Sequence, residues 1–132
     1  MIKRIDHVNI AVKDVEAALT FYRDKLGLQP SYIGPLPEEG IKHAILPTGD
    51  TFLELIEPTD PQGAVAKFLE ARGEGLYTIF LEVDDLDALV KSLKEKDIKL
   101  VDTGSLSNPP MKYAFVHPRS ASGVILGLIQ KL

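Results

Sequence analysis

His7 and Glu54, on two separate strand-like segments, could act together in proton transfer or metal binding. His7 lies in residues 4–12, where apolar and polar residues alternate, and Glu54 lies in a second extended segment, residues 51–57. Alternation places each of them on a strand face with apolar neighbours. A carboxylate in such surroundings is costly unless a partner compensates its charge. We therefore expect Glu54 to pair with His7, through a buried hydrogen bond or through a shared divalent metal ion.

Two further titratable residues could take part in such a site. Glu38 lies in a loop rich in proline and glycine, where a carboxylate either exchanges protons with a substrate or is simply solvated. His43 lies on the strand expected at residues 41–46, where it is either a substitute metal ligand or a surface residue. The side chains that strand parity places around His7 and Glu54 are Ile5, Asn9, Phe52, Ile56, Thr78, Phe80, Glu82, Ile125 and Ile129.

The chain repeats its opening pattern once. Residues 5–15 return as residues 76–86, 71 positions later, so that His7 corresponds to Thr78. A strand followed by an acidic helix start, repeated in this way, indicates two copies of one small module. We predict an α+β fold of two βαβββ modules, at about residues 1–58 and 75–132, joined by a connecting segment at residues 59–74. The two modules are expected to share one cupped mixed sheet within a single domain.

Periodicity and turn chemistry predict the elements that position these residues. The first module should have strands at residues 4–12, 29–33, 41–46 and 51–57, with a helix capped by Asp14 that ends near Gly27. The second should have strands at residues 76–83, 98–101, 111–116 and 124–130, a loop at residues 105–110, and a helix capped by Asp84 or Asp85. A short helix is expected at residues 64–71.

The composition of the first strand predicts which of its two faces is covered by a helix. Val8, Ile10 and Val12 form its uniformly apolar face, so we expect the helix after Asp14 to cover them. His7 should then point to the opposite face.

The composition excludes several classes of protein. The chain has 132 residues, which is one domain's worth, and its net charge of −4 comes without a basic stripe, so nucleic acid is not an expected partner. The absence of cysteine excludes disulfides, a thiolate nucleophile and cysteine-based zinc sites. No apolar run reaches membrane-spanning length, and residues 1–4 lead directly into a strand without a signal peptide. We expect a cytoplasmic protein with no membrane partner.

The order and spacing of several short motifs resemble those of the vicinal oxygen chelate superfamily, which includes glyoxalase I, extradiol dioxygenases and bleomycin-resistance proteins. Within it, the chain is similar to the methylmalonyl-CoA epimerases over nearly its whole length. The motifs include Ile5-Asp6-His7-Val8, Pro37-Glu38-Glu39-Gly40-Ile41, Leu53-Glu54-Leu55-Ile56-Glu57-Pro58, Gly73-Glu74-Gly75, Glu82-Val83-Asp84-Asp85 and Phe115-Val116-His117-Pro118-Arg119-Ser120.

The resemblance implies roles for particular residues. The family holds one divalent metal, such as zinc, cobalt or manganese, with four side chains, and two of these match His7 and Glu54. The other two positions hold Thr78, a poor ligand, and Gly127, which has no side chain. The family's two proton-exchanging carboxylates match Glu38 and, again, the position of Gly127. The pair Arg119 and Ser120 could hold a phosphate of a CoA-type ligand, or form an ordinary polar turn.

Three functional hypotheses follow. The first is an isomerase or lyase-type enzyme acting on an acyl-CoA or a related small acid, with His7 and Glu54 as the remaining metal ligands and Glu38 as the base. The second is a metal-free module that binds a small, largely apolar molecule, as resistance proteins of the superfamily do. The third is chemistry by a His7–Glu54 dyad without metal. The resemblance also implies a homodimer.

Overall fold

The structure is a computed structural model, and it describes residues 1–107 and 109–132. The chain forms two compact units. We call His7–Tyr77 the central unit, and Met1–Asp6 together with Thr78–Leu132 the terminal unit. The strand β1 (Ile2–Ala11) begins in the terminal unit and continues into the central one. The expected boundaries of the two modules within a single domain stay a prediction.

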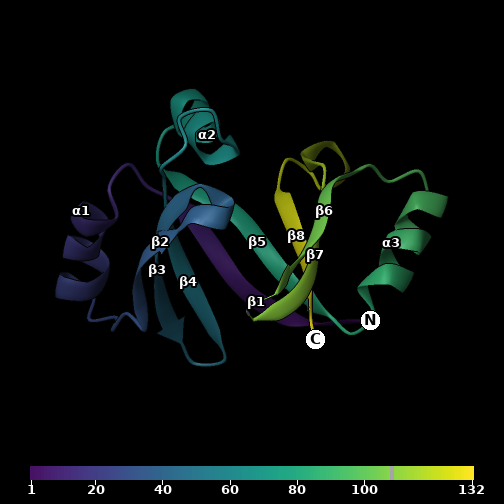
Figure 1. The fold of residues 1–132 in the computed structure, drawn as a ribbon, viewed down its shortest axis with the longest axis horizontal. Helices are drawn as coiled ribbons and strands as arrows, with labels where there is room; N and C mark the ends of the chain where they lie inside the picture. Colours follow the sequence, from purple (N-terminus) through teal and green to yellow (C-terminus); the bar gives the residue numbers. More distant parts are fainter. Residues whose placement is uncertain (108) are drawn as a thin grey trace. The chain divides into compact units, whose positions relative to one another are not determined.

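The central unit orders its strands as β2 (Tyr32–Leu36), β3 (Ile41–Thr48), β4 (Thr51–Pro58) and β1. Its antiparallel pairs are β2–β3 and β3–β4, whereas β4 and β1 run parallel. Two helices belong to this unit, α1 (Val15–Leu19) and α2 (Ala64–Arg72). Helix α1 contacts β3 and β4, and α2 contacts β4 (Figure 1).

The terminal unit has the same arrangement of four strands, beginning with its counterpart of β1. Its strands run β5 (Gly75–Val83, of which the first three residues lie in the central unit), β8 (Ile125–Lys131), β7 (Pro110–Val116) and β6 (Leu100–Ser107). Strands β5 and β8 are parallel, and the other two pairs are antiparallel. Helix α3 (Leu86–Glu95) contacts β7 and β8. The mixed eight-stranded sheet with helices confirms the predicted α+β class.

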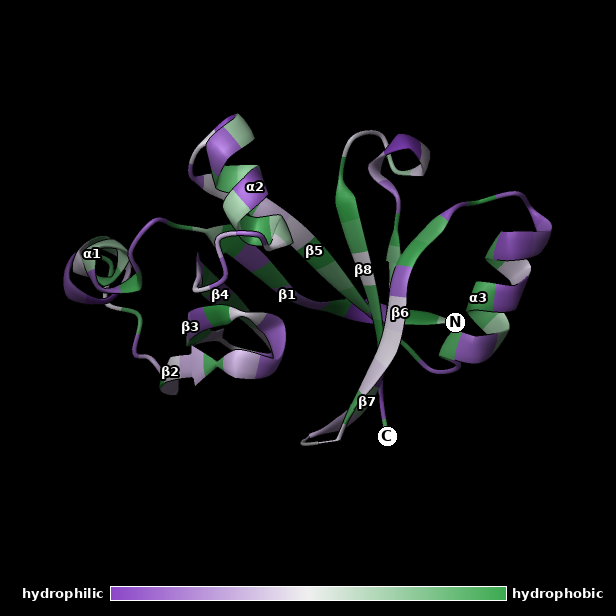
Figure 2. Cartoon of the chain, turned by 45° about the horizontal axis from the view of Figure 1, so that its top comes forward, coloured by the Kyte–Doolittle hydropathy of each residue, from purple (hydrophilic) through white to green (hydrophobic). Residues whose placement is uncertain are grey.

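Each unit has a core between its sheet and a helix. In the central unit, Val15 and Leu19 of α1 pack with Ile10, Val12 and Leu55, which confirms the predicted facing of Ile10 and Val12 on the first strand. In the terminal unit, α3 packs on β5, β7 and β8 through Leu86, Leu89, Val90 and Leu93. Figure 2 shows the resulting mixture of hydrophobic and hydrophilic residues along α3. Complete burial of one leucine side chain contributes about 2 kcal/mol. The packing of α1 and α3 therefore holds one face of each sheet against a helix, and a binding site has to use the opposite face.

The helix caps agree with the sequence. The Asp14 carboxylate accepts a hydrogen bond from the Ala17 amide at 3.2 Å, and Asp85 accepts one from the Ala88 amide at 3.0 Å. Asp84 instead pairs with the amino terminus of Met1, which settles the choice between the two aspartates. Gly27 has a positive φ of 91°, as expected for the end of the first helical segment.

Three elements differ from their predicted bounds. The helix after Asp14 is α-helical only over Val15–Leu19 and continues as a π-helical segment, η1 (Thr20–Lys25). Strand β2 includes Pro35, which the sequence placed in a loop; β2 is an edge strand, where the missing amide hydrogen of proline is tolerated. Strand β6 extends to Ser107 because it pairs with β7 up to Pro110, so the loop expected at residues 105–110 is much shorter. Asn108 of that loop lies outside the described residues.

Among the described residues, the structure shows no helix of sufficient length and apolar character to cross a membrane.

Candidate functional site

Four buried polar side chains share the face of the central sheet that α1 leaves uncovered. They come from three strands, and none is more than 9% exposed: His7 and Asn9 on β1, His43 on β3 and Glu54 on β4. Asn9 is the register partner of Glu54, and His43 is the partner of Ile56, two residues further along β4. Because register partners point to the same side of a sheet and every second residue does so too, all four lie on one face.

Glu54 contacts two imidazoles at once. Its Oε2 lies 2.6 Å from Nδ1 of His43, and its Oε1 lies 3.4 Å from Nε2 of His7. The expected His7–Glu54 pair therefore exists, but the shorter contact is the one with His43. The reading of His43 as a surface residue is wrong, because its side chain is buried against Glu54.

The contact with Glu54 orients the hydrogen on His43. An ionised carboxylate only accepts hydrogen bonds, so Nδ1 of His43 must be the donor in the 2.6 Å contact. In a neutral imidazole the other nitrogen, Nε2, then carries the lone pair and can accept a proton.

Aromatic rings hold the planes of both imidazoles. The ring of His7 stacks on that of Phe52, its register partner, with centroids 4.3 Å apart and planes inclined by 7°. Tyr32 meets His43 edge to face at 5.3 Å, and the Tyr32 hydroxyl donates to the carbonyl of Pro35 at 3.3 Å. Such contacts restrict ring rotation, so the imidazoles are held ready in one orientation.

Asn9 adds an unpaired acceptor to this face. Its side-chain oxygen Oδ1 is buried and has no hydrogen-bond partner among the described residues. A buried polar atom without a partner costs about 1–3 kcal/mol, so native proteins keep few of them. A donor group on a bound molecule would satisfy Oδ1, and this supports the expectation that Asn9 lines a ligand site.

Two acidic residues lie on a turn before β3. Glu38 and Glu39 belong to the 3-10 turn η2 (Pro37–Glu39), which ends at Gly40 in the left-handed region, with φ of 64°. Desolvation raises the pKa of the Glu39 carboxyl, the negative charge of Glu54 raises it further, and His43 and His7 oppose the change. Glu39 is nevertheless an exposed residue, so the effect on stability is small. The role of Glu38 as a base stays a prediction.

Replacing Glu39 by glutamine tests this electrostatic coupling. A carboxyl whose pKa is raised in the folded state favours folding while it is protonated, and that contribution is lost as the pH rises through its pKa. Glu39→Gln removes the titration, so we expect the variant to melt slightly above the wild type at neutral pH and together with it near about pH 3. Melting curves of both proteins across this range, with Glu95→Gln on α3 as the control, measure the difference. A Glu39→Gln variant that melts lower than wild type at neutral pH would contradict the prediction.

We call the buried group of His7, Asn9, His43 and Glu54 the central site, and its donor groups do not fit a divalent metal ion. Within residues 1–107 and 109–132, no group of three or more histidine, aspartate or glutamate side chains is arranged to hold one. His7 and Glu54 supply two donor groups, whereas protein zinc sites use three or four. His43 is bonded to Glu54 through Nδ1, and among the described residues it does not join His7 and Glu54 in a three-residue group that could hold a metal ion.

The other positions that the resemblance singled out lie in the terminal unit. Thr78 is 1% exposed, its hydroxyl has no hydrogen-bond partner among the described residues, and its register partner is Ile125. Gly127 is the partner of Phe80, whose ring covers it: a Cβ added to Gly127 would lie 2.4 Å from Cδ1 of Phe80. The position of these residues relative to His7 and Glu54 stays a prediction.

The residues predicted to contact a ligand phosphate and one of the residues predicted to line the pocket have the following surroundings. Arg119 and Ser120 lie exposed on the 3-10 turn η3 (Pro118–Ser120), where the Arg119 amide donates to Nδ1 of His117 at 3.0 Å. Their contact with a ligand phosphate stays a prediction. Ile56 is fully buried in a cluster with Ala11 and Ile41 under α2, which sequence parity did not anticipate.

Glu82, expected among the inward polar residues, belongs to an ion network of the terminal unit. Its Oε1 lies 2.9 Å from Nε of Arg4 and 3.7 Å from Nζ of Lys131. Lys131 also contacts Asp6 at 2.7 Å. Both carboxylates are buried, and each has a cationic partner, so the network has a structural role.

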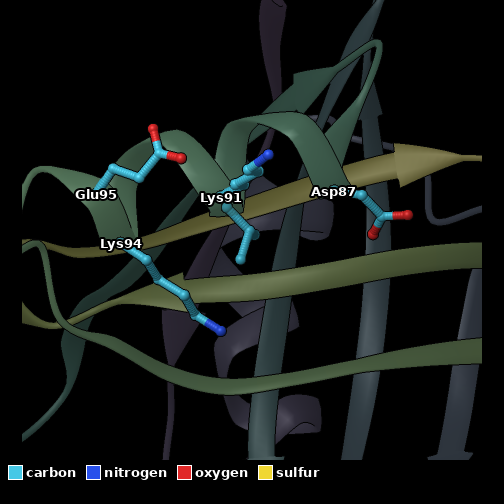
Figure 3. A pocket seen from close by; sticks show the side chains of 5 residues that line it. Asp87, Lys91, Lys94 and Glu95 are labelled. Carbon is cyan, nitrogen blue, oxygen red and sulfur yellow. The ribbon is translucent and has the colours of Figure 1, made fainter.

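An open hollow on the surface of α3 has a different character. Asp87, Lys91, Lys94 and Glu95 line it together with Val90, and Figure 3 shows the charged side chains extending from the helix. Charges of both signs are mixed along this helix face, which is typical of a solvated surface. None of the residues predicted from the sequence to form a site lies in this hollow.

Comparisons with known proteins agree with the fold and the motifs. The family model of the glyoxalase/bleomycin resistance protein/dioxygenase superfamily matches residues 6–115. Mitochondrial methylmalonyl-CoA epimerase of Mus musculus is 36% identical over 129 residues, which cover 96% of this chain and 72% of that protein. Ethylmalonyl-CoA/methylmalonyl-CoA epimerase of Cereibacter sphaeroides is 32% identical over 133 residues, covering 98% and 99% of the two chains.

A solved structure shows the same likeness. A variant of Streptomyces coelicolor methylmalonyl-CoA epimerase in complex with 2-nitronate-propionyl-CoA superposes with a TM-score of 0.87 at 30% identity, over 99% of this chain and 96% of that one. The superfamily predicted from the motifs is thereby confirmed. The chain belongs to the glyoxalase/bleomycin resistance protein/dioxygenase superfamily.

Proposed function

We propose that this chain is an epimerase-like isomerase that moves the α-proton of a small acyl-CoA thioester. The observation that carries the proposal is the buried group of His7, Glu54 and His43 on the sheet face opposite α1. It lies in a chain 36% identical to an enzyme named methylmalonyl-CoA epimerase. A preorganised imidazole–carboxylate group is suited to proton transfer and not merely to packing.

The proposed reaction is removal and return of a proton at the carbon next to the thioester. The C–H electron pair moves into an enolate, whose oxygen must be stabilised by hydrogen-bond donors. Inversion requires that the proton be taken from one side and returned to the other. We assign one of these transfers to Glu38, on the turn before β3.

The remaining roles follow from the same proposal. Phe52 and Asn9 would contact the acyl part of the substrate, and Arg119 with Ser120 would contact a phosphate of the CoA part. A cytoplasmic location and a homodimeric assembly are also parts of the proposal, and they rest on the sequence and the family resemblance alone. We derive no step through a metal ion, since the donor groups of the central site do not fit one.

The test is α-deuterium incorporation from D₂O into methylmalonyl-CoA, followed by mass spectrometry. We expect incorporation to increase with protein concentration, to persist after treatment with EDTA, and to be accompanied by inversion at the α-carbon. The absence of protein-dependent incorporation would refute the proposed function. Glu95→Gln, a change on α3, should exchange at the wild-type rate.

A metal-free binding module is the second candidate, and the unpaired Oδ1 of Asn9 favours it because a bound ligand would satisfy that atom. This candidate predicts that a ligand raises the melting temperature without turnover. A thermal shift with methylmalonyl-CoA, combined with no deuterium incorporation, would select the binding module over the isomerase.

A further inference from the structure

We propose that His43, oriented by Glu54, is the second proton-exchanging residue of this enzyme. The inference rests on the proposed function, because it assigns a step in that reaction. The family resemblance implied a second carboxylate at the position of Gly127, where this chain has no side chain. The sequence alone suggested His43 only as a substitute metal ligand or a surface residue. The register of β3 on β4 places it on the same sheet face as Glu54.

The first argument is the geometry between His43 and Glu54. Their 2.6 Å contact is buried at both ends, with exposed fractions of 7% for His43 and 8% for Glu54. A buried carboxylate that accepts from Nδ1 selects one tautomer of the ring and leaves Nε2 as the proton acceptor. It also stabilises the imidazolium that forms when Nε2 takes a proton, which is the role of the carboxylate in hydrolase triads.

The second argument is that the surroundings hold the ring of His43 in place. Tyr32 packs edge to face on it, and the tyrosine hydroxyl is itself bonded to the Pro35 carbonyl. The register partner of His43 on β2 is Gly34, and Tyr32 fills the space over this glycine: an added Cβ would lie 2.5 Å from the tyrosine oxygen. The ring is thus held by Glu54 on one side and by Tyr32 on another.

A third argument distinguishes His43 from His7. The contact of His7 with Glu54 is longer, 3.4 Å against 2.6 Å, and its ring is stacked flat on Phe52. His7 therefore depends less on the carboxylate for its orientation. We assign proton exchange to His43 and a positioning role to Glu54, which acts through His43.

The step is balanced without a further reactant. Nε2 of His43 takes the α-proton, and the C–H electron pair becomes the enolate π system with its negative charge on the thioester oxygen. The imidazolium returns a proton to the same carbon in the reverse direction. For inversion, Glu38 starts protonated and donates its proton to the opposite face of the same carbon. One turnover therefore moves one proton onto His43 and one off Glu38, so the two residues hold one proton between them before and after, and turnover in the reverse direction or exchange with solvent restores the starting states.

The first experiment measures α-deuterium incorporation into methylmalonyl-CoA by the wild type, His43→Gln and His43→Ala. We expect both variants to lose about 10²–10⁴-fold in exchange rate. Added imidazole should restore exchange in His43→Ala in proportion to its concentration, and should not do so in His43→Gln or Glu38→Gln. A residue that only supports the fold would not give this pattern. Glu95→Gln serves as the matched surface control.

The second measurement does not depend on activity. In ¹⁵N-histidine-labelled wild type, the nitrogen spectra should show His43 as the Nδ1–H tautomer, and Glu54→Ala, which removes the acceptor, should shift it toward the other tautomer. An Nε2–H tautomer in the wild type overturns the inference even if the enzyme is active and the variants do not fold. Near wild-type exchange by His43→Gln overturns it while leaving the proposed function intact. If the wild type itself catalyses no exchange, the proposed function fails, and the role of His43 fails with it.

Discussion

Replacing Glu54 by alanine is expected to lower the free energy of unfolding by about 3–5 kcal/mol, because it removes the buried carboxylate that two imidazoles contact, so that each imidazole loses this partner. Glu54 is 8% exposed and is the acceptor that His7 and His43 share. Without it, Nδ1 of His43 loses its 2.6 Å partner inside the protein, where water compensates poorly. Urea unfolding at neutral pH, monitored by circular dichroism, measures the change.

Two further variants separate the causes of this loss. Glu54→Gln keeps the volume and one acceptor oxygen, so its cost should be smaller, about 1–3 kcal/mol. Glu95→Ala on the exposed face of α3 should change stability by less than about 0.5 kcal/mol. If Glu54→Ala were as stable as Glu95→Ala, Glu54 would have to be solvated, and its buried contacts with His7 and His43 would not exist in solution.

Replacing Gly127 by alanine is expected to destabilise the protein by about 1–3 kcal/mol through overpacking. The added Cβ would lie 2.4 Å from Cδ1 of Phe80, a distance that real structures do not tolerate. The ring has little freedom to retreat, since Phe80 is 9% exposed and meets Phe115 edge to face at 5.4 Å. An aromatic side chain over a strand glycine is a known device for filling the space beside it.

A double-mutant cycle tests the assignment to Phe80. Phe80→Leu alone should cost stability, but combined with Gly127→Ala the total loss should be smaller than the sum of the two single losses. Gly34→Ala is the comparison variant: its added Cβ would lie 2.5 Å from the tyrosine oxygen of Tyr32, which is 45% exposed, whereas Phe80 is 9% exposed, so the loss at Gly34 should be the smaller of the two. Additive losses in the cycle would show that Phe80 does not oppose the new methyl group.

This packing bears on the position where the resemblance implied a fourth metal ligand and a second catalytic carboxylate. A glutamate at residue 127 would need the volume that Phe80 occupies. The substitution at this position is therefore coupled to the neighbouring strand, and restoring the side chain alone would not restore a ligand. The sequence shows that residue 127 departs from the family's pattern, but only the structure shows that the Phe80 ring fills the space beside it.

Local features of the chain were predictable because they depend on neighbours in sequence. The capping carboxylate of Asp14 bonds an amide three residues away, and strand alternation separates His7 from Val8 regardless of the rest of the fold. The repeat of residues 5–15 at residues 76–86 identified the two modules, and the spaced motifs identified the superfamily. The pairing of His7 with Glu54 was also predictable, since a carboxylate among apolar neighbours requires a partner.

The partner that Glu54 contacts most closely was not predictable in this way. Both faces of β3 are mixed, with His43 between Ile41 and Ile45 on one side and Lys42, Ala44 and Leu46 on the other. Parity within the strand therefore did not say which face is buried against Glu54. The antiparallel register that places His43 opposite Ile56 decides it. In this hairpin the register follows from the two-residue turn between the paired Thr48 and Thr51, whereas the strands expected at residues 41–46 and 51–57 left the length of that turn open.

The sequence by itself determined the superfamily, the α+β class, the Asp14 helix cap and the separation of His7 from the apolar face of its strand, because these rest on periodicity, capping and motif spacing. Only the tertiary structure decided that His43 is bonded to Glu54, that α2 covers Ile56 and that Phe80 fills the space at Gly127. The physical reason is that side-chain burial and ring packing depend on which strands and helices meet, and these contacts form only when the elements have paired and packed.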